Sequence, residues 1–272
     1  MLFSLNDSKK AKKNKRNMPS RTTTPLLSSK NIPFDYEEAY KATRTNIIFS
    51  LAEKTKGCKT IVITSAIPNE GKTTICLNLA LSFAQTEAKV LVIDADLRKP
   101  KVHTYLNLDN NVGLTNVLAG LDDISTAIKK HPSGFDYIPS GHTPPNPVEL
   151  LSSTKMEELL EKLSQSYDYI FIDTPPVMIV TDAAALAKYA TGVILVAKYM
   201  FTTRENLEKA ISNLKFANAN ILGILLNSSA YAKRRTYKKA YSRKYYKYYK
   251  YYGYEYTYGN NSLMRNNDAS QK

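Results

Sequence analysis

The chain has 272 residues and a mass of 30.6 kDa, which is enough for one large α/β domain with tails. It contains two cysteines and no secretory signal, and no apolar run approaches the roughly 20 residues that a membrane-spanning helix needs. These features predict a reduced cytoplasmic protein. The net charge of +14 lies at the ends, because residues 1–30 carry +7, residues 231–258 carry +8 and residues 259–272 carry +1, which leaves −2 for residues 31–230. A nearly neutral middle argues against a nucleic-acid protein that binds through a basic folded surface, and basic ends suit an anionic membrane surface or an acidic partner.

The N-terminal residues 1–30 are rich in Lys, Asn, Ser and Thr, and we expect them to be disordered and to precede one folded domain over residues 31–230. A helix is predicted over residues 34–51, with acids early and bases later, as the helix dipole prefers. Its apolar face is predicted from near-helical spacing of Tyr40, Ile47, Ile48 and Leu51.

Three charged residues of this helix, Glu38, Lys41 and Arg44, lie at i, i+3 and i+6 and project from nearby parts of one face. Spacing alone favours a solvated face with weak internal ion pairs. An interface where these charges meet a neighbouring subunit is the alternative interpretation.

Residues 61–74 predict a buried strand, a tight loop and the start of a helix, which is the context of a phosphate-binding P-loop motif containing Gly71, Lys72 and Thr73. Backbone N–H groups of such a loop, together with the helix dipole, form an anion site. Lys72 would reach the β- and γ-phosphates of a nucleotide, and Thr73 would place its hydroxyl on Mg²⁺. Ala66 replaces the usual first glycine of the motif, so an ordinary strand-turn-helix is the alternative on this motif alone. The residues predicted to line the nucleotide are Ala66, Pro68, Asn69, Glu70, Gly71, Lys72, Thr73 and Thr74.

Two further apolar runs, residues 90–93 and 169–172, end in carboxylates. Strands buried on both faces belong to parallel sheets, whose ligands lie beyond the carboxyl ends of the strands. Each aspartate alone would more readily be a helix cap or turn residue, but three of them after apolar strands predict one crevice. A triphosphate with Mg²⁺ needs hard oxygen ligands. The predicted metal site is Thr73, Asp94, Asp96 and Asp173.

The rest of the domain alternates strands with helices, which predicts an α/β fold, a doubly wound and mainly parallel sheet with helices on both faces. Residues 97–120 are expected to be a mostly polar connection with a short helix near 113–118; Arg98 and Lys99 at its start face either a phosphate, a partner or solvent. Asn227 ends the last strand, and its amide could contact an adenine edge or serve a plain turn. The remaining predicted strands are 135–139, 192–197 and 221–226, and the helices are 146–151, 155–164, 181–189 and 203–218.

The C-terminal tail, residues 231–272, is predicted to be flexible because it has almost no aliphatic residues and no periodicity. Twelve of the 20 tyrosines lie in residues 231–258, interleaved with Lys and Arg. Stacking on single-stranded nucleic acid is one interpretation. Beside a phosphate-transfer site, however, exposed phenols are more economically explained as phosphate acceptors, and roughly five phosphorylations would cancel the charge of the segment. The predicted acceptors are Tyr245, Tyr246, Tyr248, Tyr249, Tyr251, Tyr252, Tyr254, Tyr256 and Tyr258.

The loop 64–74, the runs 92–100 and 171–176 and the tyrosine cluster together resemble the bacterial tyrosine kinases, P-loop NTPases related to MinD and ParA, in the separate cytoplasmic form of Gram-positive organisms. The resemblance covers about residues 33–258. It implies that the three stretches are the Walker A, Walker A′ and Walker B motifs. It further implies catalytic roles for Lys72, Asp94 and Asp96: Asp94 accepts the tyrosine hydroxyl proton, while Asp96 and Asp173 hold or orient the metal and its waters.

The resemblance also implies that Glu38, Lys41 and Arg44 belong to an E-x-x-R-x-x-R helix that packs subunits into a ring. Two residues depart from the family pattern. Asn69 replaces a usual glycine, although asparagine tolerates the left-handed conformation better than most residues. Lys41 replaces an arginine and loses its bidentate geometry.

The activity implied by the resemblance is an ATP- and Mg²⁺-dependent tyrosine kinase that phosphorylates its own tail and regulates capsular or extracellular polysaccharide synthesis. The implied partners are a membrane-anchored adaptor of the chain-length regulator type, which would hold the chain at the inner face of the membrane, further copies in a ring, and an opposing tyrosine phosphatase. No nucleic-acid partner is expected. The rival is a ParA- or MinD-like ATPase switch whose basic tail binds membrane or nucleic acid. Those ATPases have an early P-loop lysine, where this chain has Ile67.

Overall fold

The computed structural model describes residues 26–29, 32–52 and 57–227, so the predicted tail 231–272 and residues 1–25 lie outside the described part. The helices are α1 (Phe34–Ala52), α2 (Lys72–Ala84), α3 (Val102–Leu106), α4 (Leu114–Ala119), α5 (Ile124–Ala127), α6 (Pro147–Leu151), α7 (Thr154–Ser164), α8 (Asp182–Ala187) and α9 (Arg204–Phe216). The strands are β1 (Lys59–Ser65), β2 (Val90–Asp94), β3 (Lys129–Lys130), β4 (Asp136–Ile138), β5 (Tyr169–Asp173), β6 (Gly192–Lys198) and β7 (Ile221–Asn227).

The strands form one seven-stranded sheet in the order β3-β4-β2-β5-β1-β6-β7. Every pairing is parallel except that of β3 with β4. Strand β1 therefore lies between β5 and β6, and β2 lies beside β5. This order brings the carboxyl ends of β1, β2 and β5 together at one edge, which confirms the predicted α/β fold.

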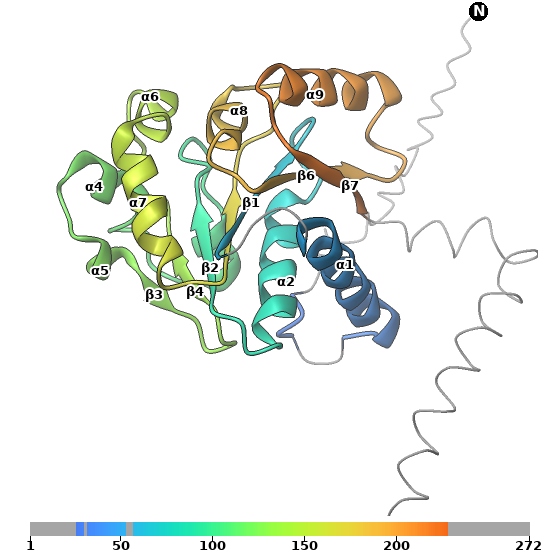
Figure 1. Cartoon of the computed structure of the whole chain (residues 1–272), viewed down its shortest axis with the longest axis horizontal. Coiled ribbons are helices and arrows are strands. Elements are labelled where there is room, and N and C mark those ends of the chain that lie inside the picture. The colour runs from blue at the N-terminus through green and yellow to red at the C-terminus, as the bar shows by residue number, and fades with distance from the viewer. Residues whose placement is uncertain (1–25, 30–31, 53–56, 228–272) are drawn as a thin grey trace, which may run out of the picture.

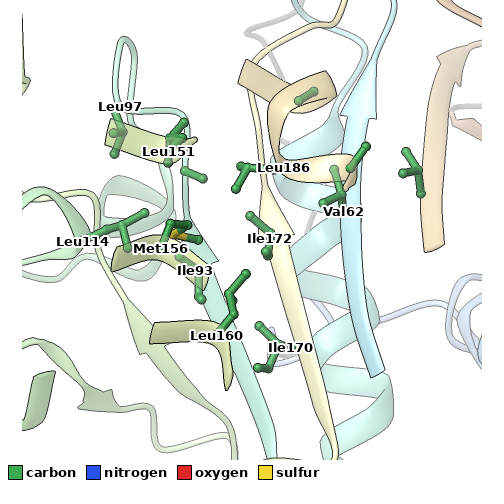
Figure 2. Packing of buried hydrophobic residues seen from close by; sticks show 14 of the residues in the cluster. Val62, Ile93, Leu97, Leu114, Leu151, Met156, Leu160, Ile170, Ile172 and Leu186 are labelled. Carbon is green, nitrogen blue, oxygen red and sulfur yellow. The ribbon is translucent and has the colours of Figure 1, made fainter. Parts of the chain in front are cut away.

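Helices cover both faces of the sheet (Figure 1). On one face, α1, α2 and α3 pack over a core that includes Phe83 and Phe171. On the other face, α4 to α9 pack over a second core, and Figure 2 shows Leu151, Met156 and Leu186 from these helices above side chains of the sheet. Because every residue of β2 and nearly every residue of β1 and β5 is buried, the strands that carry the site are held rigidly.

The predicted apolar face of the first helix was right at three of its four positions. Tyr40, Ile47 and Leu51 are buried against α2 and the sheet, but Ile48 is 38% exposed. Spacings of seven and four residues place Tyr40, Ile47 and Leu51 on one helix face. Ile48 lies about 100° round the helix from Ile47 and so points away from this face.

Residues 97–120, predicted to be a mostly polar connection, contain buried residues and the helices α3 and α4. Helix α3 forms there because the carboxylate of Asp94 accepts hydrogen bonds from the backbone N–H groups of Lys101 and Val102, at 3.1 and 2.9 Å. Val102 is fully buried, which anchors this short helix on α2. The contact is tertiary, so the local sequence gave little sign of it. The short elements α5 and β3 were not predicted.

Candidate functional site

The loop between β1 and α2 has the backbone geometry of a phosphate-binding loop. Gly71, directly before α2, has φ 90° and ψ 22°, and Asn69 has φ 68°. Asparagine therefore adopts the left-handed conformation at the position where the family usually has glycine. A hydrogen bond within the loop stabilises its conformation: the buried Glu70 carboxylate accepts from the N–H of Ile67 at 2.8 Å. Of the other residues predicted to line a nucleotide, Ala66 and Thr74 are buried and Pro68 is exposed.

The last residue of β7 and a residue in the segment after β6 bind this loop. The amide of Asn227 donates a hydrogen bond to the carbonyl oxygen of Glu70 at 2.8 Å, and the hydroxyl of Thr202 donates to the Glu70 carboxylate. A Cβ atom on Gly71 would overlap Nδ2 of Asn227 and force that amide to shift, and the φ of 90° disfavours any other residue there. Asn227 thus contacts the loop backbone, while its predicted contact with adenine stays a prediction. No sequence signal identified Thr202.

Lys72 extends from the first turn of α2 into a group of carboxylates. Its Nζ lies 3.0 Å from Oδ2 of Asp96 and 3.7 Å from Oδ1 of Asp173. The hydroxyl of Thr73 donates to Oδ2 of Asp173 at 2.6 Å. All four residues are buried, so their interactions act in a medium less polarisable than water and are correspondingly strong. The fold therefore brings together the four residues that were predicted from three separate motifs.

Asp94 lies beside this group at the end of β2, where it pairs in register with Asp173 of β5. Its Oδ2 accepts hydrogen bonds from Lys101 and Val102, and its Oδ1 accepts one from the N–H of Asp96 at 3.2 Å. A carboxylate offers about four lone-pair positions. One position therefore remains open on Asp94 for a proton or a further donor.

Burial and like charge shift the pKa values of these groups. Burial, with the charge of Asp173 adding to it, raises the pKa of Asp94 to about 7. Burial also raises the pKa of Asp173, although the Lys72 ammonium and the Thr73 hydroxyl oppose it. Burial acts to lower the pKa of Lys72, but the carboxylates of Asp173 and Asp96 outweigh it and the net shift is upward. Lys72 is therefore charged, and Asp94 exchanges its proton near neutral pH.

The donors at this edge of the sheet fit a magnesium ion held together with a nucleotide. Oδ1 of Asp173 is buried and has no hydrogen-bond partner among the described residues, so it has acceptor capacity for a metal-bound water. Within the part of the chain that the structure describes, no three acidic, histidine or cysteine side chains form a complete metal cage. Mg²⁺ rarely uses such cages in nucleotide sites, because one or two protein oxygens, waters and the phosphates complete its octahedron. Of the predicted metal residues Thr73, Asp94, Asp96 and Asp173, one or two would supply those oxygens directly and the others would hydrogen-bond the waters of the ion.

The charged residues of α1 make contacts within the chain. Lys41 pairs with both Glu37 and Glu38 at 3.0 Å, as a solvated helix face would. Arg44 donates to the carbonyl oxygen of Ser82 in α2. The subunit interface predicted for Glu38, Lys41 and Arg44 stays a prediction.

The predicted phosphate acceptors, Tyr245 to Tyr258, lie outside the described residues. Arg98 does reach a partner, but the partner is the buried Asp182 of the same chain. Across residues 26–29, 32–52 and 57–227, no helix combines the length and the hydropathy that a membrane crossing needs.

Comparison with known proteins assigns the family. A family model described as an AAA domain matches residues 58–224. The chain is 39% identical to tyrosine-protein kinase YwqD of Bacillus subtilis (strain 168) over 227 residues, which are 83% of this chain and 94% of that protein. The chain belongs to the bacterial tyrosine kinases. A second member, a putative tyrosine-protein kinase in the cps region of Klebsiella pneumoniae, is 38% identical over 206 residues, and this chain spans 28% of its length.

Solved structures of bacterial tyrosine kinases have the same fold. The kinase domain of Escherichia coli tyrosine kinase ETK superposes with a TM-score of 0.68 at 37% identity, covering 76% of this chain and 84% of that one. A more distant neighbour is the septum site-determining protein MinD of Pyrococcus horikoshii complexed with Mg-ADP, with a TM-score of 0.54 at 29% identity, covering 62% of this chain and 70% of that one. Bacterial tyrosine kinases and MinD-like ATPases therefore share the P-loop fold seen here.

Proposed function

We propose that this bacterial tyrosine kinase transfers the γ-phosphoryl group of ATP to tyrosines of its own C-terminal tail. The observation that supports this proposal is the convergence of Lys72, Thr73, Asp94, Asp96 and Asp173 beside a P-loop in a chain of this family. Lys72 and the loop N–H groups would hold the phosphates, and Mg²⁺, held by Thr73 and the carboxylates, would offset phosphate charge.

In the proposed transfer, the phenol oxygen attacks the γ-phosphorus and the bond from that phosphorus to the β,γ-bridging oxygen breaks. The phenol proton passes to the open oxygen position of Asp94, and ADP leaves. A phenol with a pKa near 10 is a poor nucleophile at neutral pH, so a carboxylate that can accept its proton during transfer assists the reaction. The raised pKa of Asp94, about 7, suits this role, because a general base works best near the operating pH.

We propose further that transfer occurs between neighbouring chains, in a ring to which Glu38, Lys41 and Arg44 contribute. A membrane-anchored adaptor of the chain-length regulator type would bring the chain to the inner face of the membrane, and capsular or extracellular polysaccharide synthesis would be the regulated process. An opposing tyrosine phosphatase would remove the phosphates. Similarity to tyrosine kinases, one of them named for a cps region, supports this part of the proposal.

The second candidate function is a MinD-like ATPase switch, which the 29% identical MinD structure keeps in view. One observation disfavours it. Ile67 stands where those ATPases have the early P-loop lysine, and its N–H is bound to Glu70 of the same loop. ATP hydrolysis without phosphotyrosine would favour the switch.

Mass spectrometry of the full chain after incubation with Mg-ATP tests the kinase proposal. We expect phosphate on several of Tyr245 to Tyr258 in the unmodified chain and none in the Lys72→Met and Asp94→Asn variants. To test transfer between chains, a Lys72→Met chain is mixed with an active chain whose nine predicted acceptors are phenylalanine. Phosphate on the Lys72→Met chain supports transfer between neighbours, and its absence while the unmodified chain labels itself contradicts it.

A further inference from the structure

An ion pair outside the phosphate-binding loop links the loop after β2, which carries Asp96, to α8, the helix that follows β5. Arg98 follows Asp96 in the loop after β2, and Asp182 begins α8, after the loop that follows β5. Nε of Arg98 lies 3.0 Å from Oδ2 of Asp182, and Nη2 lies 3.2 Å from Oδ1, so the contact is bidentate. Two parallel charge-assisted hydrogen bonds fix both distance and orientation.

The burial of the two partners is unequal. The Asp182 side chain is 0% exposed, while the Arg98 side chain is 39% exposed. A fully buried carboxylate needs a partner, because its desolvation is costly when it is unpaired. Arg98 meets that need from the loop after β2, so this loop is bound to α8 wherever the domain is folded.

The loop that Arg98 anchors is also the loop that presents Asp96 to Lys72. Oδ1 of Asp96 accepts a hydrogen bond from the N–H of Lys99 at 3.1 Å, which closes a turn over residues 96–99 with Arg98 inside it. At the base of the two loops, the N–H of Ala95 donates to the carbonyl of Asp173 at 2.8 Å. Without Arg98, the far side of the turn would lose its tie to α8.

We propose that Arg98 and Asp182 are positioning residues for phosphoryl transfer. Their ion pair holds the turn over residues 96–99 so that the Asp96 carboxylate stays within ion-pair distance of Lys72, whose ammonium also lies near Asp173. Neither residue contacts the reacting atoms. This inference rests on the proposed kinase function for its kinetic part only.

Asp182→Asn is the informative variant. It keeps the shape of the buried side chain and leaves Arg98 free to be hydrated, whereas replacing Arg98 by an uncharged residue would leave a buried charge unpaired. Arg98→Lys is the second variant, because it keeps the charge and loses the bidentate geometry. The control is Arg204→Lys with Glu208→Gln, an exposed ion pair on α9.

Kinetics separate positioning from general destabilisation. For Asp182→Asn in the full chain, we expect kcat for tail phosphorylation to fall about tenfold or more while the Kd for Mg-ATP changes less than about twofold. Arg98→Lys should fall between this variant and the unmodified chain, and the control should not change. An unchanged kcat in Asp182→Asn, or equal losses in kcat and ATP affinity, would overturn the inference.

Hydrogen exchange decides the inference without reference to catalysis. Asp182→Asn should accelerate exchange at the N–H groups of Lys99, Lys101 and Val102 and leave α2 and β1 unchanged. Uniform acceleration, or none, would refute a positioning role. If the unmodified chain makes no phosphotyrosine, the kinase proposal fails, and the exchange data still decide whether the ion pair holds the turn.

Discussion

Replacing Lys72 by methionine should remove both nucleotide chemistry and a large part of the folding free energy. The Lys72 side chain is 11% exposed and that of Asp96 is 8% exposed, while the carboxylate of Asp173 is fully buried. Methionine fills a similar volume but leaves these carboxylates without a cation. Removing one partner of a buried ion pair leaves an uncompensated charge, which is far more damaging than losing a surface pair.

The size of the effect follows from the two distances. At an effective dielectric of about 20, charges separated by 3.0 and 3.7 Å attract each other by about 5 kcal/mol each. The desolvation of the ammonium and the carboxylates offsets part of this, and the net loss on breaking a buried pair is about 3–5 kcal/mol. We therefore expect Lys72→Met to lower the free energy of unfolding by about 3–5 kcal/mol at pH 8.

The loss should depend on pH in a defined direction. Burial already raises the pKa of Asp173, and loss of the Lys72 ammonium, which opposes that shift, raises it further. The penalty for burying this carboxylate is absent below the unfolded pKa of about 4 and grows as pH rises toward the folded pKa. The deficit of Lys72→Met should thus be smaller at pH 5 than at pH 8.

Urea unfolding of the nucleotide-free chain in EDTA at both pH values measures this. Lys209→Met is the matched control, because Lys209 pairs with Glu205 on the surface of α9, where solvent screens the pair and its loss should change stability little. Adding Asp96→Asn to Lys72→Met should recover part of the loss. The reasoning is refuted if Lys72→Met is as stable as the unmodified chain at pH 8, or loses more stability at pH 5.

Three further predictions concern the loop, Asp94 and the N-terminal segment. Gly71→Ala should weaken ATP binding about tenfold or more, because the new Cβ would displace the Asn227 amide and a left-handed backbone costs alanine about 1–2 kcal/mol. The control is Gly120→Ala, where φ is 75° and only the end of Lys155 lies nearby. Equal ATP affinity in the two variants would contradict the prediction. Burial raises the pKa of Asp94 from about 4 to about 7, so between these pH values the folded state retains a proton that the unfolded chain releases. Stability without nucleotide or Mg²⁺ should therefore fall as pH rises from about 4 to 7. Asp94→Asn should reduce this pH dependence, which thermal unfolding at a series of pH values measures. Asn78→Ala should cost about 1–3 kcal/mol and speed hydrogen exchange at Leu27, whose N–H donates to the buried Asn78 side chain; unchanged exchange there would show that other contacts hold the segment.

Much of the site could be predicted because its residues follow apolar strands. The first residue of helix α2 is Lys72, and the last residues of the buried strands β2 and β5 are Asp94 and Asp173. Parallel strands bring such positions to one edge of the sheet however the helices pack. The left-handed conformation at Asn69 was also within reach of the sequence, since asparagine adopts it more readily than most residues.

Contacts between distant residues were beyond the sequence. Arg98 could equally have faced phosphate, partner or solvent, and only the fold shows that Asp182, 84 residues further along the chain, is its partner. Glu70 and Asn227 were predicted only to contact nucleotide, which stays a prediction, and the structure shows in addition that Glu70 binds the N–H of Ile67 and Asn227 binds the carbonyl of Glu70; the contact of Thr202 with Glu70 had no sequence signal. Such pairings depend on strand order and on where each loop ends in space.

The sequence by itself therefore determined the class of the sheet, the phosphate-binding loop and the carboxylates that meet there, because periodicity and strand ends are local properties of the chain. The tertiary structure decided which charges are paired, which are buried and how far their pKa values shift. Those quantities depend on the solvent and the neighbours of each group, and both are set by residues that can lie anywhere in the sequence.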